Sequence, residues 1–257
     1  MEIGRPYSRL LQRLERFNSL SSEERQYVAE LPLAVVNFSA NQEVAHQGDT
    51  PSRCTLLLNG FLCGHKAVDH SRRQITSLIV PGDIADLNTL HLTATDHSIS
   101  ALGPAVVAFL PHAAFMHMLD RSPHLARAFW REAFVEAAIL REWVVNLGRR
   151  EALARVAHVL CELVVRLQAV DLARNFCFSM PWTQMDLADV CGISGVHANR
   201  VIQELRRLGL VEWDCKQVKI LNWDGLAKVG DFSDGYLQSR TAPNGAVRLD
   251  QGLSEYV

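Results

Sequence analysis

The chain has 257 residues, with 26 Lys and Arg against 28 Asp and Glu, which gives a formal net charge of −2 at pH 7. This length suits two modest domains, and 48% hydrophobic with 21% charged residues is an ordinary globular composition. The balance excludes a strongly basic or acidic chain. A nucleic-acid-binding surface would therefore have to concentrate its positive charge locally.

Nothing in the sequence indicates secretion or a membrane span. The N-terminus is charged throughout and lacks an apolar core. The longest weakly polar run, residues 101–114, is broken by two prolines and is shorter than the roughly 18–20 residues that a span needs. The six cysteines are scattered without a C-x-x-C pair, which argues against a zinc site or a disulfide framework. We expect a cytoplasmic protein with reduced thiols, no metal site and no membrane partner.

The N-terminal part of the chain changes its pattern after about thirty residues. Residues 1–33 show helical spacing, with a capping box from Ser21 to Glu24. Residues 35–110 contain short strand-like runs separated by turn signals, which predict an antiparallel barrel or sandwich. We assign residues 1–120 to this first domain.

One turn signal in this domain predicts a specific strand pair. The residues Asn59-Gly60 stand between the apolar runs 56–58 and 61–62. Two residues of this type between apolar runs are typical of a tight β-hairpin. We therefore expect these two runs to pair with each other.

Residues 123–147 predict one long helix, because Ala, Leu, Arg and Glu dominate and no glycine or further proline interrupts them. Six residues in it follow spacings of 3, 4, 3, 4 and 3, as in a coiled-coil seam. They are Trp130, Ala133, Ala137, Leu140, Val144 and Leu147. We expect residues 121–148 to form a dimerisation helix that pairs with its copy across a twofold axis. Alternatively, the stripe packs only on its own domain.

Residues 183–210 carry the signature of two helices joined by a short turn. Thr183 and Asp186 form a capping box for the first helix, Gly192 can end it in the left-handed conformation, and Ser194 can cap the second. Apolar residues of the second helix recur at helical spacing. They are Ala198, Val201, Ile202, Leu205 and Leu208. Together these features predict a helix-turn-helix.

A second β segment follows the helix-turn-helix. Residues 210–213 and 218–221 predict a hairpin, the wing of a winged helix-turn-helix domain that we place at 149–228. The remainder, 229–257, is expected to be a C-terminal tail, because its last residues are mixed and turn-rich.

The outward face of the second helix carries Val196, Asn199, Arg200 and Gln203 at helical spacing. If it enters a major groove, Arg200 can donate two hydrogen bonds to guanine O6 and N7. Asn199 and Gln203 suit adenine or a phosphate, and Val196 suits a thymine methyl group. The alternative is a solvated polar face.

Residues at the helix ends are expected to contact the DNA backbone. Ser194, Thr183 and His197 stand where helix ends meet phosphates. Arg206 and Arg207 lie further along and would add attraction that is independent of sequence.

Three stretches of the chain resemble the Crp/Fnr family of transcription regulators. HQGD at 46–49 with PGD at 81–83 resembles the family's β-roll sensor, residues 141–168 its dimer helix and hinge, and residues 192–210 its recognition helix. The resemblance implies an α+β fold. It would comprise an N-terminal antiparallel, jelly-roll-like β-roll, a long dimerisation helix and a C-terminal winged helix-turn-helix.

Within the DNA-binding part, the resemblance carries over residue by residue. Arg200 matches the family arginine that reads guanine, and Thr183 and Ser194 match phosphate contacts. Val196 stands where the best-known members have glutamate. Gly195 replaces the arginine of the cyclic-AMP-responsive type. We therefore expect a different half-site preference.

The sensor part departs further from the cyclic-nucleotide binders. Their Gly-Glu-Leu turn corresponds here to Ala85-Asp86-Leu87, and their Arg-Ser pair corresponds to His97-Ser98. The candidate effector pocket comprises Asp86, Leu87, His97 and Ser98. Without the arginine a buried phosphate lacks its charge partner, and Asp86 would repel it, so cyclic AMP or GMP is not expected. No cysteine precedes Cys54, so the oxygen-sensing branch's iron–sulfur cluster is not expected either. The effector, if one is needed, stays unidentified.

The sequence therefore predicts a homodimeric, sequence-specific regulator that binds double-stranded DNA at a palindromic site. RNA polymerase is a candidate partner. The alternative is a sensor or adaptor whose winged domain binds a protein instead of DNA. No nucleophile motif, P-loop or Rossmann glycine pattern supports an enzyme.

Overall fold

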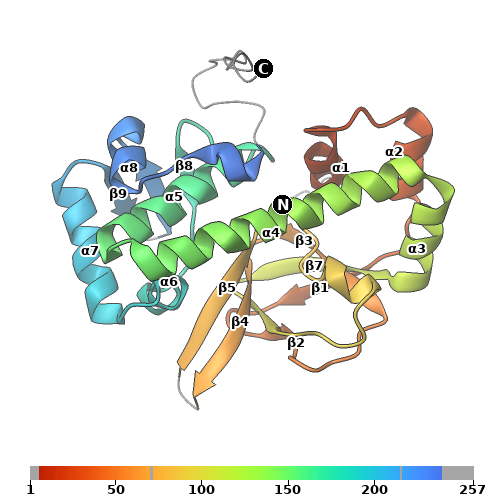
Figure 1. Cartoon of the computed structure of the whole chain (residues 1–257), viewed down its shortest axis with the longest axis horizontal. Helices are drawn as coiled ribbons and strands as arrows, with labels where there is room; N and C mark the ends of the chain where they lie inside the picture. Colours follow the sequence, from red (N-terminus) through yellow and green to blue (C-terminus); the bar gives the residue numbers. More distant parts are fainter. Residues whose placement is uncertain (1–5, 70–71, 215, 239–257) are drawn as a thin grey trace, which may run out of the picture.

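The computed structural model describes residues 6–69, 72–214 and 216–238. It has an α+β architecture in three parts: an N-terminal β domain, one long helix and a C-terminal helical domain with a small sheet (Figure 1). The long helix α4 (Pro123–Arg149) runs across the molecule and connects the two domains. This is the order of parts that the sequence predicts.

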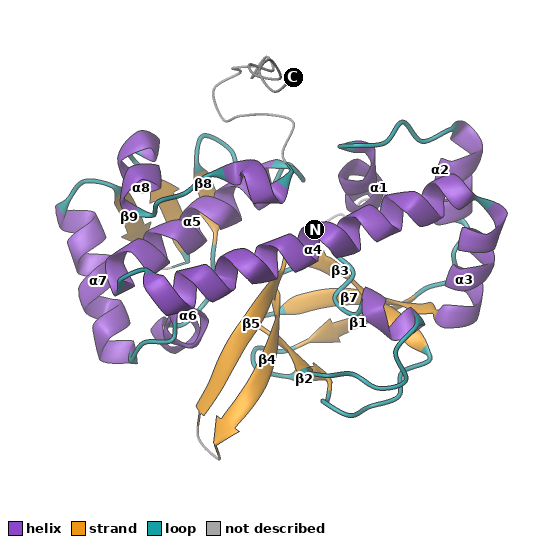
Figure 2. Ribbon diagram, viewed as in Figure 1, coloured by secondary structure: helices purple, strands orange, loops and turns teal. Residues whose placement is uncertain are grey.

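Two antiparallel sheets form the N-terminal β-roll (Figure 2). The strands are β1 (Ala34–Phe38), β2 (Glu43–Ala45), β3 (Arg53–Asn59), β4 (Leu62–Asp69), β5 (Arg72–Ile79), β6 (Ser98–Ala101) and β7 (Ala105–Pro111). One sheet has the order β1-β7-β3 and the other β2-β6-β4-β5. Leu57 and Val107 from the first sheet share one fully buried core with Leu62 and Ile99 from the second, so the domain is a roll closed around this core.

The turn at Asn59 and Gly60 does not close a hairpin, so this prediction is wrong. Strand β3 pairs with β7, whereas β4 pairs with β5 and β6, and the turn carries the chain from one sheet to the other. Gly60 has a φ of +85°, and a Cβ there would stand 2.3 Å from the carbonyl oxygen of Pro104. Glycine is therefore required by a close backbone approach at the corner between the sheets. The hairpin of this region is β4–β5.

Three helices close one end of the roll: α1 (Ser8–Glu15), α2 (Ser22–Ala29) and α3 (His112–Arg121). Their apolar residues, Leu14 and Phe115 among them, pack in a second core with the outer side of the β3–β7 sheet. The predicted capping box is present, since the Ser21 hydroxyl accepts from the amide of Glu24 while the Glu24 carboxylate accepts from the amide of Ser21.

Helix α4 confirms the predicted long helix and spans 27 residues, about 40 Å. The hydroxyl of Ser122 accepts a hydrogen bond from the amide of Leu125, and Pro123 occupies the first turn, where its missing amide costs nothing. One face packs on the protein's own domains. Its buried residues are Leu125, Ala128, Phe129, Val135, Ile139, Trp143 and Asn146.

The C-terminal domain is built around α5 (Ala152–Gln168), which is buried almost all round. Its other elements are β8 (Cys177–Ser179), α6 (Gln184–Cys191), α7 (Gly195–Arg207), β9 (Val211–Asp214), β10 (Gln217–Ile220) and α8 (Trp223–Val229). Strands β9 and β10 pair antiparallel, which confirms the predicted wing hairpin. Strand β8, which the sequence analysis missed, pairs with the other edge of β10.

The chain continues in folded form beyond α8. A 3-10 helix (Asp234–Leu237) packs against α4 and α5, with Leu237 buried. The hydroxyl of Tyr236 donates to Oε2 of Glu162 at 2.9 Å. The tail boundary expected at 229 is therefore too early, because residues 230–238 belong to the folded domain. The expected tail from residue 239 onward lies outside the described residues.

A buried ion network joins the β-roll to the C-terminal domain. The guanidinium of Arg166 on α5 donates to Oδ2 of Asp83 in the roll at 2.7 Å and to Oε1 of Glu162 at 3.0 Å. The indole of Trp143 on α4 donates to the other oxygen of Glu162 at 3.0 Å. All three parts of the molecule thus meet at one set of paired charges, which fixes their positions.

Candidate nucleic-acid interface

Helices α6 and α7 form the predicted helix-turn-helix. Thr183 caps α6, and its hydroxyl accepts from the amide of Asp186. Gly192 ends α6 with φ +60° and ψ +40°, the left-handed conformation that the sequence predicted. Ser194 caps α7 by accepting from the amide of His197 at 3.2 Å. Local capping therefore sets where both helices begin and where the first one ends.

The inner face of α7 fixes its orientation. Four of the five predicted apolar residues are buried in the core that α5 and α6 also line, and only Leu208 is exposed. The buried residues are Ala198, Val201, Ile202 and Leu205. Because this face is packed, the opposite face of the helix has to point to solvent.

The structure brings the predicted base-reading residues together on that outward face. Val196 is 67% exposed, Arg200 and Gln203 are exposed, and Asn199 is half-buried. A shallow hollow at the front of α7 is lined by residues of both helices. They are Gln184, Met185, Ser194, Gly195, Val196, Asn199 and Arg200. The sequence analysis missed the two α6 residues, although their place directly after the Thr183 cap was a usable signal.

The guanidinium groups of Arg200 and Arg207 differ in whether they have a hydrogen-bonding partner. Within the described residues, the Arg200 guanidinium makes no hydrogen bond or ion pair. Arg207 instead forms two hydrogen bonds with Glu204, at 2.7 and 2.8 Å. This pairing lowers the pKa of Glu204 and raises the pKa of Arg207. Arg200 therefore keeps its five donors available for a ligand, whereas Arg207 is already engaged.

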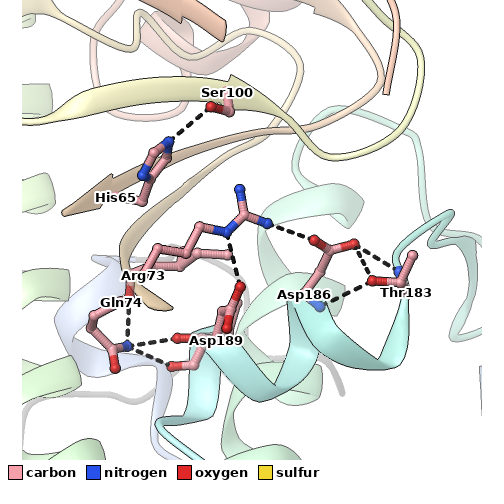
Figure 3. A network of polar contacts seen from close by, with 9 residues as sticks. His65, Arg73, Gln74, Ser100, Thr183, Asp186 and Asp189 are labelled. Carbon is pink, nitrogen blue, oxygen red and sulfur yellow. Dashed lines mark hydrogen bonds and ion pairs between the residues drawn. The ribbon is translucent and has the colours of Figure 1, made fainter. Parts of the chain in front are cut away.

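The β4–β5 hairpin of the roll reaches over to α6 (Figure 3). Arg73 donates to Asp186 at 2.7 Å and to Asp189 at 2.9 Å, and the Gln74 amide donates to the carbonyl oxygen of Asp189 at 2.8 Å. Asp186 also accepts from the amide and hydroxyl of Thr183 at 2.8 Å. The residue that anchors the N-terminus of the helix-turn-helix is thus held directly by the β-roll. We name this contact the hairpin clamp.

The predicted seam of α4 lies beside its buried stripe and is only partly covered by the protein's own domains. Trp130 is 57% exposed, Leu140 41% and Val144 72%, and Ala133 is also exposed. The remaining two seam residues, Ala137 and Leu147, are half-buried. Phe134, 71% exposed on the same face, was not predicted because it falls outside strict seam spacing. A strip of apolar side chains is therefore exposed to solvent along α4 in the single chain.

A cavity of about 480 Å³ lies between the roll and α4. Its lining includes Leu87 and His97 from the predicted effector pocket, together with Lys66 and Asp96. On the helix side it is lined by part of the seam. These residues are Trp130, Ala133, Ala137 and Leu140, with Glu136 beside them. Burial is the main cause that raises the pKa of Glu136, and the negative charge of nearby Asp83 raises it further.

Two of the four predicted pocket residues do not line this cavity. Asp86 is 2% exposed, and its carboxylate accepts from the amide of Thr55 at 2.6 Å and from its hydroxyl at 2.8 Å. Ser98 accepts from the amide of Gln47 at 3.0 Å. Both side chains are used to join loops to strands, and neither lines this cavity. Burial raises the pKa of Asp86.

His97 is the predicted pocket residue with an unused polar atom. Its Nδ1 contacts Asp96 at 2.8 Å, while its buried Nε2 has no partner within the described residues.

No group of three or more His, Cys, Asp or Glu residues in the described ranges is arranged to hold a metal ion. In the same part of the chain, no helix is long and apolar enough to cross a membrane.

A winged helix-turn-helix with an outward-facing arginine, joined to a β-roll, is the architecture of a DNA-binding transcription regulator. Residues 154–229 match the model of the Crp-like helix-turn-helix domain, and residues 35–122 match that of the cyclic nucleotide-binding domain. The chain belongs to the Crp/Fnr family of transcription regulators. The family assignment made from the sequence is confirmed.

Named relatives agree with this class. The transcriptional activator protein FnrL of Cereibacter sphaeroides is 25% identical over 206 residues, which cover 78% of this chain and 82% of FnrL. The nitrogen fixation regulation protein FixK of Bradyrhizobium diazoefficiens is 28% identical over 176 residues, 68% of this chain and 73% of FixK. The structure of FixK2 from Bradyrhizobium japonicum superposes with a TM-score of 0.70 at 20% identity, covering 77% of this chain and 98% of FixK2.

Proposed function

We propose that this regulator acts as a homodimer that binds a palindromic DNA site through α7, with Arg200 reading a guanine in each half-site. The observation that carries this assignment is the Arg200 guanidinium, which has no partner among the described residues and is held outward by a helix whose other face is packed. Arg200 presents a planar fork that matches guanine O6 and N7. Val196 and Asn199 lie next to it on the same hollow and would contact neighbouring bases.

The apolar strip on α4 supports the dimer. Trp130, Phe134 and Val144 are each more than half exposed, which is costly for a monomer in water. Two copies of α4 packed in parallel would bury the strip, and Ala133 and Ala137 would let the helices approach closely. To bind successive major grooves of a palindromic site, the two α7 helices of this dimer would have to stand about 34 Å apart.

Salt dependence separates this function from a protein-binding adaptor. The affinity for a mixed-sequence duplex should fall about a thousandfold between 50 and 200 mM salt, if the dimer engages six or more phosphates. Fluorescence anisotropy of a labelled 30-base-pair duplex measures this change. An affinity for DNA that is absent at 50 mM salt, or that does not respond to salt, would argue for the adaptor instead.

We further propose that the cavity between the roll and α4 takes an uncharged, mainly apolar effector rather than a cyclic nucleotide. An anionic phosphate would face the carboxylates of Asp96 and Glu136, against the single positive charge of Lys66. Lys66 is itself 4.0 Å from Asp96. Because Trp130 and Leu140 belong both to the cavity wall and to the dimer seam, a ligand there would contact the dimer helix directly. The hairpin clamp gives a physical link from the roll to α6.

Thermal unfolding tests the exclusion of cyclic nucleotides. Cyclic AMP or cyclic GMP at 1 mM should leave the midpoint temperature unchanged, with 5′-AMP as the matched control. A ligand at a hundred times its dissociation constant stabilises the folded state by about 2.7 kcal/mol, which shifts the midpoint by several degrees. A rise of that size with a cyclic nucleotide, but not with 5′-AMP, would contradict the proposal.

A further inference from the structure

Two exposed apolar side chains stand at the front of a surface that is otherwise polar. Met185 in the first turn of α6 is 59% exposed, and Val196 in the first turn of α7 is 67% exposed. Both line the shallow hollow that Asn199 and Arg200 also line. Although they come from different helices, both lie in this one hollow with Arg200, and the Met185 thioether lies next to Gly195, the residue before Val196.

Gly195 explains why the two side chains come together. A Cβ built on Gly195 would lie 2.6 Å from Sδ of Met185, so the thioether crosses the place where a side chain at position 195 would begin. Met185 thus fills the position that residue 195 would otherwise occupy at the N-terminus of α7. A methionine is flexible and polarisable, and it can follow the contour of a base edge.

Neither side chain can make a strong hydrogen bond to a base edge. In the major groove the exposed apolar group of the four bases is the 5-methyl group of thymine. The N-terminal half of a recognition helix is the part that enters this groove. A thymine opposite the pair would bury its methyl group against apolar atoms, whereas cytosine has only a hydrogen at C5 and would leave this contact unmade.

We infer that Met185 and Val196 together contact the 5-methyl group of one thymine in each half-site, next to the base read by Arg200. This inference rests on the proposed DNA-binding function and adds a specificity determinant from α6. Met185 acts through its thioether and terminal methyl, and Gly195 leaves the space for them.

Deleting single methyl groups from the DNA tests the contact. Binding sites are first selected from a random duplex library with the full-length protein, and each thymine of the selected site is then replaced by deoxyuridine. One symmetric position should weaken binding about fourfold per half-site, the value expected for one buried methyl group. At the same position 5-methylcytosine should bind more tightly than cytosine.

Protein variants assign the effect to these residues. Met185→Ala should bring the thymine-to-deoxyuridine ratio of affinities close to one, and Gly195→Ala should lower it by displacing the thioether. Leu208→Ala, an exposed apolar residue at the C-terminal end of α7 and outside the hollow, should leave the ratio unchanged. A selected site that does not respond to methyl deletion, or a ratio that persists in Met185→Ala, overturns the inference and leaves the DNA-binding function standing. Selection that enriches no sequence overturns both.

Discussion

Replacing Val144 with aspartate should convert the protein from a dimer to a monomer. Val144 is 72% exposed in the single chain, so the substitution leaves the packing of the monomer intact. At a twofold seam, however, two carboxylates would face each other in a buried strip. An uncompensated buried charge costs about 3 kcal/mol or more, so the dimer dissociation constant should rise at least about a hundredfold. Sedimentation equilibrium measures this constant.

Val145→Asp provides a matched control. Val145 is the adjacent residue, 45% exposed, and it lies one position off the seam. The same change there should leave the dimer intact. Far-ultraviolet circular dichroism shows whether both variants stay folded. If Val144→Asp remains a dimer, α4 is not the dimer helix. The strip of Trp130, Phe134 and Val144 would then need another occupant.

Local signals predicted the helix-turn-helix almost completely. The Thr183 cap, the left-handed Gly192 and the Ser194 cap act within a few residues, so each can be recognised from a short stretch of sequence. The heptad spacing of α4 is equally local. These parts of the candidate site can therefore be placed by residue number from the amino-acid sequence alone.

Strand pairing in the roll was harder to predict from the sequence, because it depends on residues far apart in the chain. The Asn59-Gly60 turn has the composition of a hairpin, yet β3 pairs with β7 about fifty residues later. Likewise, Asp86 and Ser98 match family positions, but Thr55 and Gln47 engage their polar atoms. A sequence motif shows which residue type stands at a position, but it does not show which distant residue will form a hydrogen bond with that side chain.

Met185 and the hairpin clamp illustrate a further limit. Met185 is apolar and follows a cap, which is as typical of a core residue as of a contact residue. Its exposure follows from Gly195, whose missing side chain lets the thioether lie across α7. Arg73 and Asp186 are 113 residues apart and show no sequence pattern that links them. Both features depend on how elements distant in the sequence pack together.

Arg200→Ala should remove sequence discrimination while leaving the dimer and the fold intact. The side chain is exposed and makes no ion pair or hydrogen bond within the described residues, so its loss has little effect on stability. Each half-site would lose a bidentate contact to guanine, worth about 1–3 kcal/mol. Two half-sites then reduce specific affinity by about thirtyfold or more. Arg200→Lys should behave similarly, since an ammonium cannot form the fork.

The most direct measurement is the ratio of affinities for the selected site and for a scrambled duplex, in wild type, Arg200→Ala and Arg207→Ala. Arg207 pairs with Glu204, so its removal should change both affinities little and equally. For Arg200→Ala the ratio should collapse towards one. An unchanged ratio in that variant would contradict the assignment of Arg200 as the residue that reads the DNA.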